Sequence, residues 1–157
     1  MTDPTQNTPY PAPTPGKDHE RARRVAIDAA ASLSDDKCEH VVVLDLRGRS
    51  QVADYFVVAT GTSERQMKSA AASVAQLAAE AGVPLFRSNK DQPGQSWVLL
   101  DFVDVVVHVF EPSARAYYDL EVLWGDGPKV DWKADRGPAR QPRPAGSTNA
   151  RQIPSAD

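Results

Sequence analysis

Two short apolar segments, residues 97–102 and 104–110, constrain the fold most strongly, because a single residue separates them. Both are rich in β-branched and aromatic residues, which favour strands, so they predict an antiparallel pair. If Phe102 and Val103 form the connecting turn, Trp97 lies opposite His108. Side chains alternate between the two faces of a strand, and in this pair neither face is predominantly polar.

The two faces of this strand pair differ in composition. One face is purely aliphatic and must be core: Val98, Leu100, Val105, Val107 and Val109. The other is largely apolar but carries polar groups: Trp97, Leu99, Val106, His108 and Phe110, with Asp101 and Asp104 near the turn. This second face has two interpretations. Either a helix covers it, as is usual for sheets in such folds, or part of it is an exposed docking patch with acidic groups at its rim.

Helical and extended patterns alternate in the rest of the chain. Apolar spacing predicts a helix at about 18–33 and a second that begins at Ser63 and ends at Gly82. Short β-branched runs predict strands at 41–46, 55–60 and 85–87, and a last helix follows at about 114–123. The resulting order, α-β-β-α-β-β-β-α, predicts an α/β (α+β) fold with a mixed sheet of about five strands and flanking helices.

Composition divides the chain into three parts. Residues 1–16 contain five prolines and no Lys or Arg, and a Pro- and Arg-containing stretch closes the chain. We therefore expect a domain at 17–126 between disordered tails at 1–16 and 127–157. No apolar run approaches the ~20 residues that a membrane span needs, and the N-terminus does not resemble a secretory signal. The single cysteine, Cys38, fits a reducing compartment, so we expect a cytoplasmic protein.

Charge indicates the class of partner. Residues 17–124 contain 12 basic and 16 acidic side chains, whereas a domain that grips a phosphate backbone is usually basic. Little or no direct RNA contact by this domain is expected. A basic protein partner is the simpler inference.

The sequence predicts no catalytic residue, metal or cofactor. Gly61-Thr62-Ser63 stands at a strand-to-helix junction, but it lacks the Walker and dinucleotide glycine patterns, so helix capping explains it. The three histidines have no metal-site spacing. The carboxylates in or beside the strands show no spacing that requires a metal.

Several segments together resemble the ribosomal silencing factor (RsfS/Iojap) family. They are Asp54–Val58, Gly61-x-Ser63-x-x-Gln66, Trp97–Asp101, Asp104–Phe110, and a last group of Arg115, Tyr117, Leu120, Glu121 and Trp124. Their order and spacing match over about residues 20–126, and the combination is specific although each segment alone is weak.

The resemblance implies a fold related to nucleotidyltransferases, without transferase activity. It implies binding to the fourteenth protein of the large ribosomal subunit, which blocks joining of the small subunit and represses translation when nutrients are limiting. The second strand face and the family's motifs suggest Trp97, Leu99, His108, Tyr117 and Trp124 as docking residues, with Asp101, Asp104 and Glu121 as an acidic rim. An exposed apolar patch also allows a homodimer of the free protein.

A nucleotidyltransferase-like enzyme is the alternative from another functional class. Such an enzyme needs two metal-sharing carboxylates soon after its Gly-Ser loop, whereas here only Glu64 follows before Glu80. The chain departs from the family at two places. The loop at 88–95 lacks the usual Glu-Gly, and Val103 replaces the usual turn glycine. A β-branched residue disfavours the positive φ that such a glycine supplies.

Overall fold

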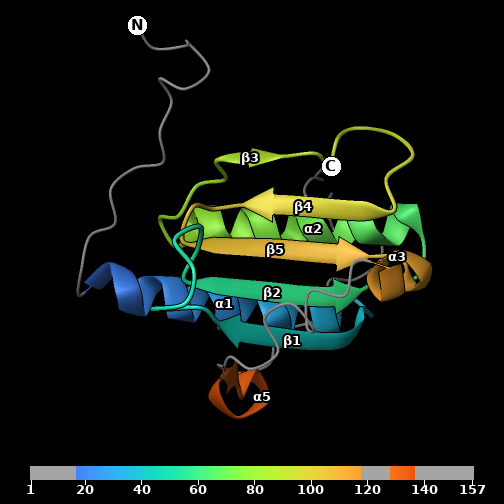
Figure 1. Ribbon diagram of the computed structural model, residues 1–157. Helices are drawn as coiled ribbons and strands as arrows, with labels where there is room; N and C mark the ends of the chain where they lie inside the picture. Colours follow the sequence, from blue (N-terminus) through green and yellow to red (C-terminus); the bar gives the residue numbers. More distant parts are fainter. Residues whose placement is uncertain (1–16, 118–127, 137–157) are drawn as a thin grey trace, which may run out of the picture.

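The structure is a computed structural model that describes residues 17–117 and 128–136 (Figure 1). Its elements follow one another as α1 (Lys17–Asp35), β1 (Glu39–Asp45), β2 (Tyr55–Thr60), α2 (Glu64–Glu80), β3 (Arg87–Ser88), β4 (Trp97–Asp101), β5 (Val105–Phe110), α3 (Pro112–Tyr117), β6 (Lys129–Val130) and α5 (Trp132–Asp135). The strands form one sheet in the order β3-β4-β5-β2-β1-β6. β2 and β5 pair in parallel, and the neighbouring pairs are antiparallel. The predicted mixed α+β sheet with flanking helices is confirmed, with β6 as a sixth strand.

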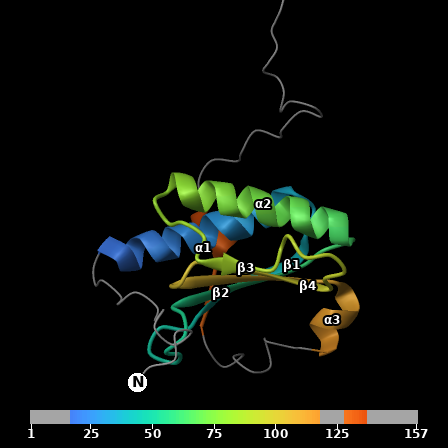
Figure 2. The same ribbon diagram turned by 90° about the horizontal axis from the view of Figure 1, so that it is seen from above.

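Helices α1 and α2 lie together on one face of the sheet (Figure 2). Both are rich in alanine, whose small side chain allows a helix to approach a sheet closely. The Ser63 side chain accepts a hydrogen bond from the Gln66 amide, and the Gln66 side chain accepts one from the Thr62 amide, so the predicted cap of α2 is confirmed. No helix in the described residues is both long and apolar enough to cross a membrane.

The aliphatic sheet face predicted to be core packs against these helices. Val98, Leu100, Val105, Val107 and Val109 are fully buried, and they share one cluster with alanines of α1 and α2 and with Met67. This assignment of the face is confirmed.

The predicted register of the β4–β5 hairpin is wrong by two residues. Trp97 lies opposite Phe110, and Leu99 lies opposite His108. The turn consists of Val103 and Asp104, because the Phe102 amide already donates to the Val105 carbonyl at 2.8 Å. Side chains alternate between faces with a period of two, so a register shift of two residues leaves each side chain on the same face. The predicted composition of the two faces is therefore still correct.

The turn explains this error. Val103 has φ +79°, a conformation that is disfavoured for a β-branched residue. Two hydrogen bonds hold it there: the Asp101 side chain accepts from the Val103 amide at 2.8 Å, and the Phe102 carbonyl accepts from the Asp104 amide at 3.0 Å. The surrounding contacts therefore impose a conformation that valine alone avoids.

The ordered fold continues past the predicted boundary at residue 126. Val130 of β6 pairs with Val43 of β1. Trp132 of α5 is only 6% exposed, and its indole nitrogen donates to the Val41 carbonyl at 3.0 Å. Residues 127–157 are Pro-rich on average, so their composition predicts disorder. The average does not reveal that a single residue, Trp132, packs into the core. The expected tails at 1–16 and beyond residue 136 lie outside the described residues.

Candidate docking surface

The sheet face opposite α1 and α2 is lined by a second apolar cluster. Its buried members are Leu44, Leu46, Ala53, Phe56, Val58, Val106, Phe110 and Ala114. Val42, Trp97 and Leu99 are only partly buried against it. In the described part of the chain, cover on this side comes from the β1–β2 connection and the start of α3 rather than from a long helix. Trp97 and Leu99 of β4 are partly exposed on this face.

Four rings gather on this face, and we refer to Phe56, Trp97, His108 and Phe110 as the aromatic cluster. The Trp97 indole nitrogen donates to Nδ1 of His108 at 3.2 Å. The Trp97 ring centroid lies 5.0 Å from that of Phe110. The Phe56 ring meets His108 edge-on at 4.6 Å. These separations are typical of favourable aromatic pairs, so the cluster holds the Trp97 ring in a defined orientation.

His108 is the buried polar member of the aromatic cluster. It is 4% exposed, and burial lowers its pKa from 6.5 to about 4, against the opposing charge of Asp101. The ring is therefore neutral at pH 7. Because Nδ1 accepts from Trp97, the proton belongs on Nε2. Nε2 is buried and has no hydrogen-bond partner among the described residues.

Comparison with known proteins identifies the family. The family model described as "Ribosomal silencing factor during starvation" matches residues 19–156. The chain belongs to the ribosomal silencing factor family. It is 43% identical over 103 residues to the ribosomal silencing factor RsfS of Halalkalibacterium halodurans, which covers 66% of this chain and 87% of the relative. The Bacillus subtilis RsfS is 42% identical over 103 residues, covering 66% and 86% of the two chains.

A solved structure agrees with this family assignment. The crystal structure of a Chromobacterium violaceum protein superposes with a TM-score of 0.62 and 40% identity, covering 66% of this chain and 86% of that protein. The name of the family describes a regulator of ribosomes rather than an enzyme.

Asn89 positions the backbone of β4 at Trp97 and Leu99. The short edge strand β3 pairs with Leu100 and Asp101 only. Further along the same edge, the Asn89 amide donates to the Trp97 carbonyl at 2.8 Å and accepts from the Leu99 amide at 2.8 Å. One side chain thus replaces a paired strand and holds the backbone of both Trp97 and Leu99. In the sequence, Asn89 is one of several polar residues in the loop at 88–95, so no local pattern indicates this role.

The structure brings some of the predicted docking residues together and separates others. Trp97, Leu99 and His108 share the sheet face opposite α1 and α2. Trp97 and Leu99 are partly exposed there, whereas the His108 side chain is buried and is not available for direct contact with a partner. Asp104 is half-buried in the turn, where its carbonyl accepts from the Asp54 amide at 2.8 Å. Only the backbone of Tyr117 is described, at the end of α3. Glu121 and Trp124 lie outside the described residues.

Asp101 is inside the fold rather than on an exposed rim. It is 4% exposed, and its two carboxylate oxygens accept from the Arg87 side chain at 3.1 Å and the Val103 amide at 2.8 Å. A carboxylate engaged in this way positions the turn and is poorly placed to bind a metal ion. Across residues 17–117 and 128–136, no group of three or more His, Cys, Asp or Glu side chains could hold a metal. The geometry of this face suits binding of a protein surface.

Proposed function

We propose that this silencing factor binds the large ribosomal subunit through its fourteenth protein and sterically blocks joining of the small subunit. Translation would thereby be repressed in the cytoplasm when nutrients are limiting. The observation that carries the proposal is the aromatic cluster on a sheet face that α1 and α2 leave uncovered. Family membership supports the same function.

The open side chains match what a protein interface requires. The partly buried Trp97 side chain is held by its own hydrogen bond and by the neighbouring rings. It therefore loses little side-chain entropy when a partner binds. Interfaces concentrate their energy in such preorganised aromatic residues. The acidic excess between residues 17 and 124 favours a basic partner and accelerates encounter. Once bound to the large subunit, the protein would block joining of the small subunit simply by occupying its site.

The test compares two tryptophan truncations on opposite sides of the sheet. Trp97→Ala removes the proposed anchor, whereas Trp132→Ala removes a core residue next to α1. We expect Trp97→Ala to weaken binding to purified large subunits by about 2 kcal/mol, roughly 30-fold, and to restore subunit joining. Trp132→Ala should lower stability but leave the affinity of the folded protein unchanged.

Circular dichroism at the temperature of the binding assay controls for folding of both variants. A folded Trp97→Ala protein that still binds and still blocks joining at the wild-type concentration would show that another face docks. Glu121→Gln should have a smaller effect than Trp97→Ala, mainly on the association rate and its salt dependence.

A further inference from the structure

Asn89 uses the donors of its side-chain amide within the protein. Its Nδ2 donates to the Trp97 carbonyl at 2.8 Å and to Oε1 of Gln95 at 3.1 Å, and its Oδ1 accepts from the Leu99 amide at 2.8 Å. A side-chain amide nitrogen has two hydrogens, so both of its donors are engaged. The side chain is therefore arranged to hold β4 rather than to donate to a partner.

These contacts close the outer edge of β4. Alternate residues of an antiparallel strand bond to the same neighbour, and the Leu99 amide bonds to Asn89 instead of to β5. Leu100, which pairs with Val107, therefore points its amide toward β5. Because β3 is only two residues long, the backbone at Trp97 and Leu99 has a side chain where a strand would otherwise pair. Without Asn89, this part of the sheet edge would be open.

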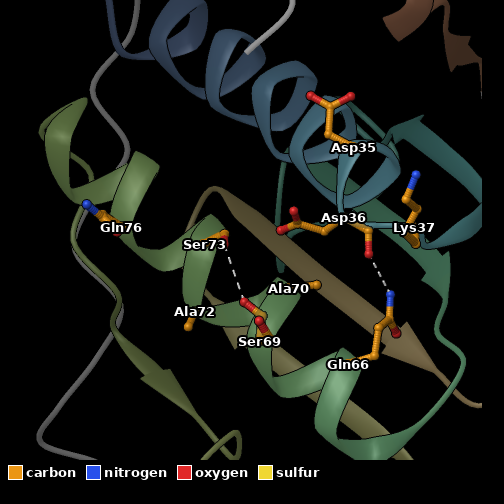
Figure 3. Close-up of a pocket in the computed structure, with 9 residues that line it drawn as sticks. All are labelled: Asp35, Asp36, Lys37, Gln66, Ser69, Ala70, Ala72, Ser73 and Gln76. Carbon is orange, nitrogen blue, oxygen red and sulfur yellow. Dashed lines mark hydrogen bonds between the residues drawn. The ribbon is translucent and has the colours of Figure 1, made fainter. Parts of the chain in front are cut away.

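The loop between β3 and β4 is also attached to α2. Glu64, in the first turn of α2, accepts from the Gly94 amide at 2.7 Å. The same end of α2 is fixed to the chain just after α1, because the Gln66 side chain donates to the Asp36 carbonyl at 2.9 Å (Figure 3). The loop is therefore held from two sides, by the helical layer at Gly94 and by β4 at Asn89.

We propose that Asn89 is a positioning residue for binding of the large subunit, and that Glu64 supports it by holding the loop. This inference rests on the proposed function, because it concerns the same face. Asn89 fixes the backbone from which Trp97 and Leu99 project, while the aromatic cluster fixes the Trp97 side chain. A surface that is preorganised in this way loses less conformational entropy when it binds.

Amide hydrogen exchange in the free, full-length protein tests the positioning itself. In Asn89→Ala the Leu99 amide loses its acceptor, so its exchange should accelerate by about 10-fold more than that of the Leu100 amide. Leu100 is the internal control because its amide points toward β5. Equal acceleration at both positions, or none at Leu99, would overturn the proposal, since Asn89 would then not hold this edge.

Binding to purified large subunits tests whether the positioning matters for function. Asn89→Ala should weaken binding by about 10-fold, mainly through faster dissociation. Glu64→Ala should weaken it less, whereas Glu64→Gln keeps an acceptor for the Gly94 amide and should bind nearly as the wild type does. Gln92→Ala is the matched control and should have no effect, because Gln92 is an exposed residue of the same loop whose side chain accepts from Gln95. Circular dichroism at the assay temperature controls for folding.

A double-mutant cycle separates positioning from direct contact. If Asn89 acts through Trp97 and Leu99, its substitution should weaken binding by only about 2-fold in a Trp97→Ala background. The full effect in that background would show that Asn89 contacts the partner itself. Tighter binding of Asn89→Ala would show that a strand of the partner pairs with the edge that Asn89 closes. Either result would overturn the proposal.

The two tryptophan and asparagine variants also separate this inference from the proposed function. Weaker binding of Trp97→Ala together with wild-type binding of Asn89→Ala would overturn the inference and leave the proposed function standing. Wild-type binding of a folded Trp97→Ala protein would overturn both.

Discussion

The two faces of the sheet are built from the same strands but differ in chemistry. On the face under α1 and α2, β4 and β5 contribute the fully buried aliphatic residues Val98, Leu100, Val105, Val107 and Val109, and β2 adds the buried Tyr55. The opposite face has the aromatic cluster, a buried histidine whose Nε2 has no partner among the described residues, and the partly exposed Trp97 and Leu99 on β4. The aliphatic side chains of β4 and β5 satisfy packing alone. The aromatic face retains polar and partly exposed groups that cost stability, which is expected if this surface also binds a partner, as proposed.

Neighbouring leucines on β4 provide the sharpest test of this difference. Leu100 is fully buried under the helices, whereas Leu99 is half-buried on the aromatic face. Leu100→Ala should lower the free energy of unfolding by about 2–5 kcal/mol because it leaves a cavity. Leu99→Ala should lower it by only about 1 kcal/mol.

The affinity for large subunits should show the reverse order. Leu99→Ala should weaken binding, whereas the folded fraction of Leu100→Ala should bind as the wild type does. Denaturant titration and a binding isotherm measure the two quantities. Equal stability losses in the two variants would mean that the second face is as closed as the first.

Acid should act on the aromatic face through His108. Its folded-state pKa of about 4 is below the ordinary 6.5, so between these values the unfolded chain binds more protons. The contribution of neutral His108 to the free energy of unfolding should therefore be fully present above pH 6.5. It should be lost as the pH drops toward 4, which lowers the free energy of unfolding by about 3 kcal/mol in total.

The matched variant is His108→Gln, which can still accept from Trp97 but does not titrate in this range. The difference in unfolding free energy between wild type and His108→Gln, measured from pH 7.5 to 4.5, isolates the contribution of the histidine. A difference that does not change with pH would show that His108 is not desolvated in the folded protein.

Periodicity and capping sufficed to predict the helical side of the molecule. The apolar stripe of α2, its Ser63 cap and the aliphatic strand face depend on local spacing, which the sequence displays directly. Three features depend on contacts between distant residues and could not be read in this way. Asn89 pairs across a loop with β4, Trp132 packs against β1 from a Pro-rich region, and Arg87 neutralises Asp101.

The smallest predicted effect concerns the turn that connects the two strands shared by both faces. Val103 has φ +79°, which for a β-branched residue costs of the order of 1–2 kcal/mol. Val103→Gly removes this strain but also removes a half-buried side chain and adds freedom to the unfolded chain. We expect a net stabilisation of up to about 1 kcal/mol, with unchanged binding to the large subunit.

Val103→Ala is the matched control, because it shortens the side chain but keeps the penalty of positive φ for an L-residue. The glycine variant should therefore be more stable than both the alanine variant and the wild type, as measured by urea titration. If glycine is instead the least stable of the three, the side chain of Val103 contributes more than its backbone costs. The turn would then be held by packing, and the hydrogen bonds that Asp101 and Phe102 accept would not be compensating for strain.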